Sequence, residues 1–149
     1  MPCIEVKDDR SGNIINDVYK KRNCICFYYW NDCNHCKLFK PVFNRTMIMI
    51  RGDDRLKNTF IFKIEYDNYR YLPEELRTVQ AFPAIIAYRN GEQVDEFKDQ
   101  RTEEKLSDFI LNSSGEPSAS YNGSLEKKSR SSSRIKKVIK QYYPKSSRV

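Results

Sequence analysis

The sequence predicts an α/β domain built on a central mixed sheet of four to five strands, with helices on both faces. Two observations lead to this fold class. Over residues 1–112, short apolar runs alternate with segments whose apolar residues recur at helical spacing, a pattern typical of a sheet covered by helices. Near the end of this region an Asn-Gly turn joins two short strands, and such a hairpin makes the sheet mixed.

The first predicted elements are two strands and two helices. Residues 3–7 form a short strand, residues 8–12 a polar turn, and residues 13–22 a helix with apolar side chains at helical spacing. Residues 24–30 are continuously apolar, as in a strand that is covered on both faces. Residues 33–50 carry an apolar stripe at helical spacing, which predicts a longer helix.

Pro41 lies inside this longer helix, where its missing N–H predicts a kink. The run at residues 59–66 predicts the next strand. A short helix is expected at residues 73–78, after which the chain returns to the sheet.

The last predicted elements are a hairpin and a helix. Residues 84–88 and 93–97 predict two strands joined by the Asn-Gly turn at residues 90–91. Residues 102–111 predict an amphipathic helix with Thr102 as its N-cap. The alternation of strands and helices therefore continues to the end of the domain.

The charge distribution separates this domain, residues 1–112, from a basic tail, residues 113–149. The full chain of 149 residues has a formal charge of +7, but its first 112 residues hold 18 basic and 18 acidic side chains. Residues 113–124 are small, polar and rich in serine, which predicts a flexible linker. All of the excess positive charge therefore lies in a tail that we expect to be disordered.

The tail has basic clusters among serines, and four of its apolar residues recur at helical spacing: Ile135, Val138, Ile139 and Tyr142. Such a segment could form a basic amphipathic helix on an acidic surface, for which nucleic acid, anionic lipid or an acidic protein would serve. A solvated tail that mainly aids solubility explains the same composition.

Composition narrows the class of protein. The chain begins without the basic and apolar stretches of a secretory signal, and no run reaches the 18 or so apolar residues of a membrane span. Its five cysteines are an odd number without the spacing of a disulfide framework. We therefore expect a soluble protein of the cytoplasm, where a close pair of thiols is more often catalytic than structural. We also expect a monomer.

Cys33 and Cys36 are the candidate reactive groups, because they lie two residues apart where an apolar strand gives way to a helix. This arrangement favours a redox dithiol. A zinc site needs four ligands, and only Cys24 and Cys26 could be recruited in principle, since the single histidine, His35, lies inside the motif. We predict no metal and no other cofactor, while an inert pair of structural cysteines stays an alternative.

Four features together resemble the thioredoxin family over residues 3–112. They are the apolar strand that leads into Cys33-x-x-Cys36-Lys37, Pro41 five residues after the second cysteine, Phe82-Pro83 at the start of a strand, and Asn90-Gly91 in the hairpin after it. The resemblance implies a thioredoxin fold. A compact redox domain with a basic tail is also similar to thioredoxin-like proteins of large DNA viruses, which would be compatible with packaging in a virion.

The resemblance implies a thiol-disulfide oxidoreductase whose partners are protein disulfides or dithiols. Cys33 is expected to be the attacking thiolate, because backbone N–H groups and the helix dipole lower the pKa of a thiol at a helix N-terminus. Cys36 is expected to resolve the mixed disulfide. By the same resemblance the Phe82-Pro83 peptide bond is cis and faces the dithiol, so that Phe82 and Pro83 bind an extended segment of the partner.

His35 lies between the two cysteines, as a histidine does in the Gly-His dipeptide of protein disulfide isomerases. An imidazole near Cys33 stabilises the thiolate and so makes the disulfide a better oxidant. We therefore count His35 among the catalytic residues and expect a reduction potential above the roughly −270 mV typical of thioredoxin. The alternative is that His35 is merely an exposed polar residue in the first turn of the helix.

Departures from the family pattern argue for a slow or specialised enzyme. Asp32 replaces the tryptophan that usually precedes the first cysteine, and its charge opposes thiolate formation. Phe27 occupies the position of the family's buried acid, so the proton relay for Cys36 is missing or supplied by another group. Lys63 matches the lysine that pairs with that acid, and Glu65 could take the acid's place. The alternative function is a catalytically weak binding module, tethered by its basic tail to nucleic acid or another acidic surface.

Overall fold

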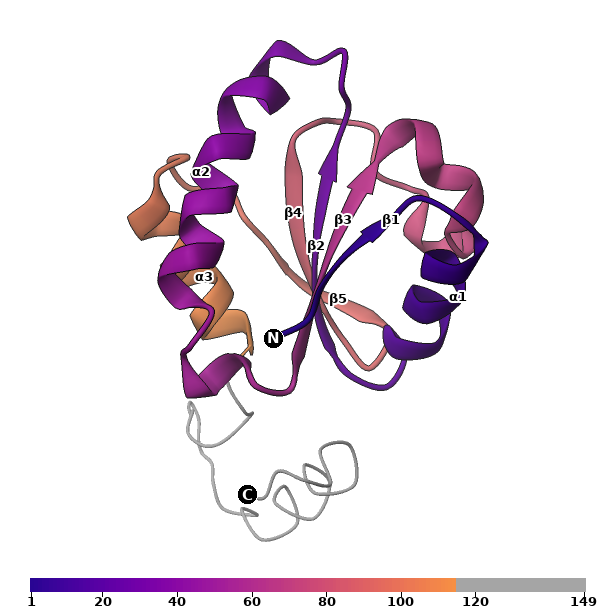
Figure 1. Cartoon of the computed structure of the whole chain (residues 1–149), viewed down its shortest axis with the longest axis horizontal. Coiled ribbons are helices and arrows are strands. Elements are labelled where there is room, and N and C mark those ends of the chain that lie inside the picture. The colour runs from indigo at the N-terminus through magenta and orange to yellow at the C-terminus, as the bar shows by residue number, and fades with distance from the viewer. Residues whose placement is uncertain (115–149) are drawn as a thin grey trace, which may run out of the picture. The chain divides into compact units, whose positions relative to one another are not determined.

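The computed structural model describes residues 1–114, and they contain one five-stranded sheet with the strand order β1-β3-β2-β4-β5 (Figure 1). The strands are β1 (Cys3–Val6), β2 (Asn23–Tyr29), β3 (Thr59–Glu65), β4 (Ala84–Arg89) and β5 (Glu92–Glu96). Both β1 and β2 pair with β3 in parallel, while β4 runs antiparallel to β2 and β5 antiparallel to β4. The predicted mixed sheet is confirmed, including the hairpin at Asn90 and Gly91, which both have positive φ.

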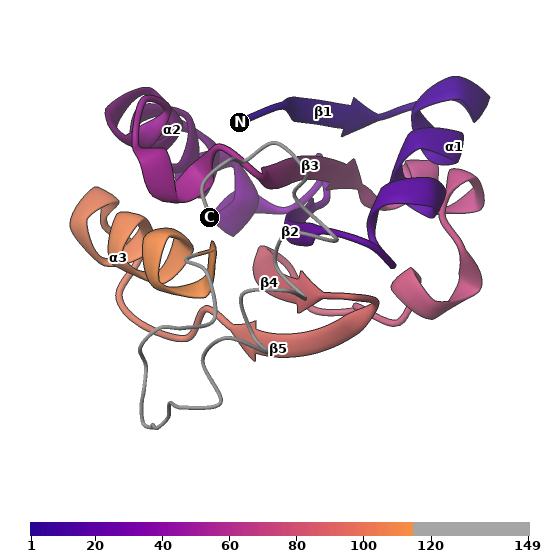
Figure 2. The ribbon, with the colours of Figure 1, turned by 90° about the horizontal axis from the view of Figure 1, so that it is seen from below.

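Helices cover both faces of the sheet, as predicted (Figure 2). They are α1 (Asp9–Val18), α2 (Asn34–Ile50) and α3 (Glu103–Ser114). The helix α1 lies on one face, and α2 and α3 lie together on the other. Three 3-10 turns complete the described part of the chain: η1 (Asp54–Leu56), η2 (Tyr66–Tyr71) and η3 (Glu74–Leu76).

The first helix begins earlier than the sequence predicts, so the expected polar turn at residues 8–12 is wrong. The Asp8 carboxylate accepts a hydrogen bond from the Ser11 backbone N–H at 2.9 Å, and the Ser11 hydroxyl accepts one from the Asp8 N–H at 3.1 Å. This capping box starts a helix in a segment that looks like a turn by composition. Gly12 is then a packing residue, because a Cβ there would collide with the Tyr71 carbonyl oxygen.

The other predicted helices have mixed outcomes. The long helix α2 matches the predicted residues 33–50 and contains Pro41, while the kink predicted at Pro41 stays a prediction. The helix predicted at residues 73–78 is only the short turn η3. Thr102 caps α3 as predicted, with its hydroxyl accepting from the Lys105 N–H at 3.2 Å.

The helix α3 also runs past its predicted end at residue 111, and tertiary contacts explain the added turn. The Ser113 carbonyl accepts a hydrogen bond from the Arg89 side chain at 3.0 Å, and the Ser114 carbonyl accepts one from Asn23 at 3.3 Å. The predicted linker beyond this point and the basic tail lie outside the described residues.

The central strand β2 divides the core into two apolar layers, because all seven of its residues are buried. Side chains of Cys24, Cys26 and Tyr28 join the layer beneath α1. Those of Ile25, Phe27 and Tyr29 join the layer beneath α2 and α3. The continuous apolar run in the sequence therefore does report a strand covered on both faces.

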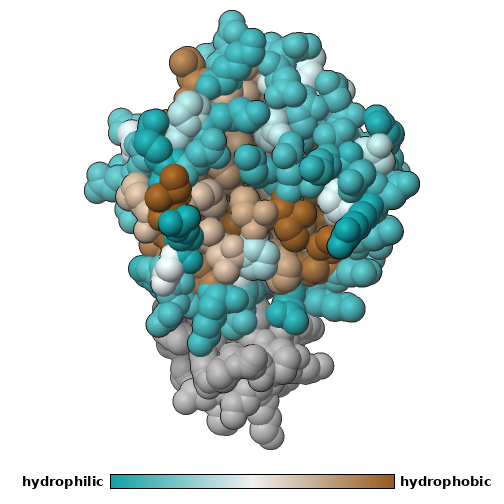
Figure 3. Space-filling view, in the orientation of Figure 1, coloured by the Kyte–Doolittle hydropathy of each residue, from teal (hydrophilic) through white to brown (hydrophobic). Residues whose placement is uncertain are grey.

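The surface of the described residues is largely polar. The face in Figure 3 is mostly hydrophilic, with apolar side chains gathered across its middle. The most exposed large apolar side chains are those of Leu38, Ile48 and Met49, all on α2. Within residues 1–114, no helix has the length and apolar character needed to cross a bilayer.

Replacing Phe27 by alanine should lower the free energy of unfolding by about 3–5 kcal/mol, because Phe27 is fully buried and its removal leaves a cavity. Its ring stacks on Phe43 with centroids 4.4 Å apart and meets the edge of Phe39 at 5.6 Å. Urea titration followed by circular dichroism measures the loss. The control Leu38→Ala, on a side chain that is 74% exposed, should change stability by less than about 0.5 kcal/mol.

Candidate active site

Cys33 occupies the N-cap position of α2. The strand β2 ends at Tyr29, the Cys33 N–H then closes a turn on the Trp30 carbonyl at 3.0 Å, and the helix begins at Asn34. The Cys33 Sγ accepts a hydrogen bond from the Cys36 backbone N–H at 3.3 Å. A sulfur in this position takes the place of the oxygen that usually caps a helix, so it meets N–H groups that have no partner inside the helix.

The two sulfurs of the motif have different surroundings. Cys33 is half-buried at the surface, whereas Cys36 is only 1% exposed and belongs to the core layer beneath α2. The Cys36 Sγ accepts a hydrogen bond from the Trp30 N–H at 3.5 Å. A partner in solution can therefore reach Cys33, while Cys36 can be reached mainly through Cys33.

These surroundings separate the acidities of the two thiols. Partial burial alone would raise the pKa of Cys33, but hydrogen bonds from Cys36 and from the backbone N–H groups of Cys36 and His35 outweigh it, and the pKa is lowered. Burial raises the pKa of Cys36, and its hydrogen bond to Cys33 adds to the increase. Cys33 is thus the thiol that ionises first.

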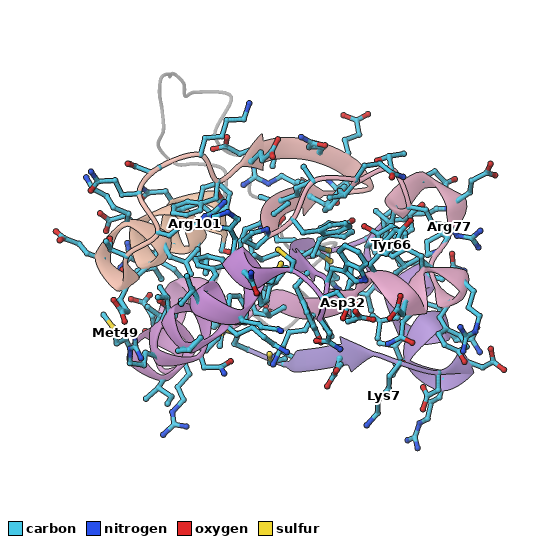
Figure 4. The ribbon with its side chains drawn as sticks, turned by 90° about the horizontal axis from the view of Figure 1, so that it is seen from above. Lys7, Asp32, Met49, Tyr66, Arg77 and Arg101 are labelled. Carbon is cyan, nitrogen blue, oxygen red and sulfur yellow. The ribbon has the colours of Figure 1, made fainter. Side chains whose placement is uncertain are left out.

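Arg101 is a charged neighbour of the dithiol that the sequence analysis missed. It lies in the loop between β5 and α3, and its charge lowers the pKa of both cysteines. Its guanidinium lies 5.9 Å from the centre of the Phe39 ring. Figure 4 shows Arg101 on the α3 side of the molecule. No local spacing in the sequence connects this loop to the motif, so only the fold could reveal it.

Phe82 lies against Cys33, and its peptide bond to Pro83 has the form that the sequence analysis expected. The Phe82 carbonyl oxygen is 3.7 Å from the Cys33 Sγ, and the peptide bond between Phe82 and Pro83 is cis. The sheet brings them together because β4, which begins at Ala84, pairs with β2. Any chain covalently bound to Cys33 must therefore pass close to the Phe82 backbone.

A cluster of four aromatic side chains near the dithiol was also not predicted from the sequence. It consists of Trp30, Tyr66, Tyr69 and Phe82. The Tyr66 ring centre lies 5.9 Å from that of Trp30, 4.9 Å from Tyr69 and 5.3 Å from Phe82. Tyr66 is 37% exposed and projects from η2 (Figure 4). In the sequence, the segment after β3 is rich in tyrosine, but its tyrosines have no periodicity that would place them together on one surface.

The side chains of Asp32 and His35 are exposed. The contribution of His35 to the acidity of Cys33 comes from its backbone N–H. A catalytic role for its imidazole therefore stays a prediction.

Metal ligands do not gather at this site. Among residues 1–114 there is no group of three or more His, Cys, Asp or Glu side chains that could hold an ion. Cys24 and Cys26 face the core layer beneath α1, while Cys36 faces the layer beneath α2. Burial raises the pKa of Cys24 to about 12, so this thiol stays protonated. Recruitment of Cys24 and Cys26 to Cys36 would need them to cross the sheet.

Comparison with known proteins agrees with this architecture. A family model described as thioredoxin matches residues 4–112. The chain belongs to the thioredoxin family. The features described above are therefore those of a thioredoxin domain. They are the element order β1-α1-β2-α2-β3, the dithiol at the start of α2, and the cis proline before β4.

Individual relatives include protein disulfide isomerases. The chain is 28% identical over 137 residues to a protein disulfide-isomerase of Datisca glomerata, covering 90% of this chain and 26% of that protein. It is 26% identical over 98 residues to mouse protein disulfide-isomerase A5, covering 66% of this chain and 19% of the other. This thioredoxin-family chain therefore spans about a quarter or less of the length of these relatives.

Among solved structures, the first thioredoxin domain of mouse protein disulfide-isomerase A4 has a TM-score of 0.59 with this chain at 21% sequence identity. The match covers 84% of each chain. At this identity the likeness establishes the shared thioredoxin fold.

The buried acid of the thioredoxin pattern is replaced, as the sequence indicates. Phe27 is fully buried among aromatic rings. Glu65 is buried too, but its carboxylate accepts hydrogen bonds from the backbone N–H groups of Asn31 and Asp67. The pKa of Cys36 is shifted by its burial and by three neighbours, namely Cys33, the Trp30 backbone and Arg101.

The pH at which Cys33 reacts should report its lowered pKa. In a Cys3→Ser background, the rate of alkylation by iodoacetamide should reach half its maximum at a lower pH than in the unfolded chain, because the thiolate is the reactive form. Arg101→Gln should move this midpoint to higher pH, since a positive charge that favours the thiolate is removed. Arg51→Gln, at the other end of α2, should leave it unchanged. Equal midpoints in all three proteins would contradict the role of Arg101.

Proposed function

We propose that this protein is a thiol-disulfide oxidoreductase that exchanges a dithiol for a disulfide with protein partners. The observation that carries the proposal is the pairing of an accessible Cys33, with lowered pKa, and a buried Cys36 with raised pKa, joined by a hydrogen bond at the start of α2. Membership of the thioredoxin family supports the same class of reaction. The matched isomerases are several times longer, so their substrates are not carried over.

In the reducing direction, the Cys33 thiolate attacks one sulfur of the partner's disulfide. A bond forms between Cys33 and that sulfur, the partner's S–S bond breaks, and the released sulfur takes a proton to become a thiol. Cys36 then loses its proton and attacks the Cys33 sulfur, which releases the second partner thiol. The partner gains two electrons and two protons, and Cys33 and Cys36 end as a disulfide.

The position of Phe82 supports a path for the partner chain. Its carbonyl lies beside the Cys33 sulfur, so an extended segment held by Cys33 would run along Phe82 and Pro83. Such a segment could form backbone hydrogen bonds there in the manner of an added strand. The half-buried rings of Trp30 and Phe82 and the exposed Tyr66 would then line one side of the path.

Two departures from the family pattern, Asp32 before the nucleophile and Phe27 in place of the buried acid, support a slower disulfide exchange than that of a typical thioredoxin. The negative charge of Asp32 adjoins the nucleophile, and Phe27 offers no group that can take the proton of Cys36. The mechanism therefore rests on Cys33 activation by the helix N-terminus and Arg101.

Reduction of insulin by the protein with dithiothreitol as electron donor tests the proposal. Cys33→Ser should reduce the rate to the uncatalysed background, because the nucleophile is gone. Cys36→Ser should accumulate the mixed disulfide with Cys33, which mass spectrometry detects. Cys3→Ser, which removes an exposed thiol from β1, serves as the control and should keep the rate. A wild-type rate no higher than background would favour a binding module instead.

The reduction potential of the dithiol should lie above the roughly −270 mV typical of thioredoxin, because groups that stabilise the thiolate also stabilise the reduced form. Equilibration in glutathione redox buffers, followed by alkylation and mass spectrometry, measures it. His35→Ala should lower the potential if the imidazole contributes as proposed. A wild-type potential at or below about −270 mV would contradict the prediction that this dithiol is more oxidising than that of a typical thioredoxin.

A further inference from the structure

Glu65 is the last residue of β3, and its carboxylate is buried beside the segment that carries the dithiol. The residue is only 4% exposed. Its two oxygens bind different parts of the chain: Oε2 accepts from the Asn31 N–H at 3.0 Å, and Oε1 accepts from the Asp67 N–H at 2.8 Å. One side chain thus joins two loops that leave neighbouring strands of the sheet.

The first of these loops leads from β2 to Cys33. Asn31 follows Trp30, whose carbonyl accepts the Cys33 N–H and whose own N–H binds the Cys36 sulfur. The hydrogen bond to Glu65 therefore fixes Asn31, which lies in the chain between Trp30 and the nucleophile Cys33.

The second loop is η2, which carries Tyr66. Glu65 caps this turn through the Asp67 N–H, and the Tyr66 ring then packs against both Trp30 and Phe82. Phe82, whose carbonyl lies beside the Cys33 Sγ, is thereby connected to the same carboxylate. Figure 4 shows Tyr66 on the η2 side of the molecule and Asp32 in the loop before α2.

The chemistry of a carboxylate suits this bridge. A buried ionised group is costly unless hydrogen bonds compensate it, and the ion pairs formed among residues 1–114, Arg45–Glu103 and Arg55–Asp53, do not involve Glu65. Its compensation comes instead from two backbone donors, which a carboxylate can accept with one oxygen each. A glutamine of the same shape has only one acceptor oxygen and would direct its NH₂ group at the other donor.

We propose that Glu65 is a positioning residue that fixes the Cys33 loop relative to Tyr66 and Phe82. These parts then keep the relative position in which a partner's disulfide can approach Cys33. This role rests on the proposed oxidoreductase function. It differs from that of a proton acceptor for Cys36, because both carboxylate oxygens are engaged by backbone N–H groups and Glu65 is not among the groups that shift the pKa of Cys36.

Glu65→Gln in the full-length protein tests the role. The KM for insulin should rise about tenfold, the factor expected when one buried hydrogen bond is lost, while kcat stays within about twofold. The pH midpoint for alkylation of Cys33 should not move. Glu5→Gln is the matched control, since it removes a carboxylate of β1 that accepts from the Tyr29 hydroxyl at 3.1 Å without touching the Cys33 loop.

Hydrogen exchange of individual amides, measured by NMR, tests the same role without relying on activity. The Asn31 or Asp67 amide should exchange about tenfold faster in Glu65→Gln than in wild type, while amides of the β2–β3 ladder are unchanged. If wild-type protein has no turnover, the proposed function fails and this measurement alone decides the role of Glu65. Should Glu65→Gln not fold, Glu65→Asp, which keeps both oxygens on a shorter stem, allows the same comparisons.

Two results would overturn the proposal. Unchanged exchange at both Asn31 and Asp67 would show that the carboxylate does not hold the loops. A loss in kcat with unchanged KM, accompanied by a shifted pH profile for turnover, would assign proton transfer to Glu65 instead of positioning.

Discussion

The hydrogen bond from the Cys36 N–H to the Cys33 sulfur is the interaction on which the site depends. It exists because the chain turns after β2, where the Cys33 N–H binds the Trp30 carbonyl, and α2 begins directly after Cys33. A thiol at the N-cap meets unpaired backbone N–H groups, and these favour its thiolate. The same geometry places Cys36 one helical turn further on, inside the core. Reactivity and burial are thus divided between the two sulfurs by a single strand-to-helix junction.

The distribution of buried carboxylates distinguishes this thioredoxin domain. Phe27 lies where the family pattern has an acid, and it fills the core by stacking on Phe43. The buried carboxylate belongs instead to Glu65, on the neighbouring strand, and it binds backbone N–H groups. An apolar ring in the core avoids the cost of burying a charge, but it cannot move a proton. The dithiol therefore depends more on its backbone environment and on Arg101 than on a buried acid.

Four segments far apart in the sequence form the site. The loop before α2 supplies the dithiol, η2 supplies Tyr66, the start of β4 supplies Phe82 and Pro83, and the loop before α3 supplies Arg101. They meet because β2 lies between β3 and β4 in the sheet. This arrangement surrounds Cys33 with an aromatic surface on one side and a cation on another.

The sequence by itself determined the strands, the hairpin and the strand-to-helix junction at Cys33, while the approach of Phe82 to the dithiol was implied by the resemblance to thioredoxins. These features follow from local patterns, namely apolar runs, turn residues and the thioredoxin motifs. Only the tertiary structure decided how η2 folds and what Glu65, Tyr66 and Arg101 contact. Such contacts join segments that are distant in the chain, so no local periodicity encodes them. The early start of α1 is instructive, because a capping box at Asp8 and close packing of Gly12 on Tyr71 overcame a turn-like composition.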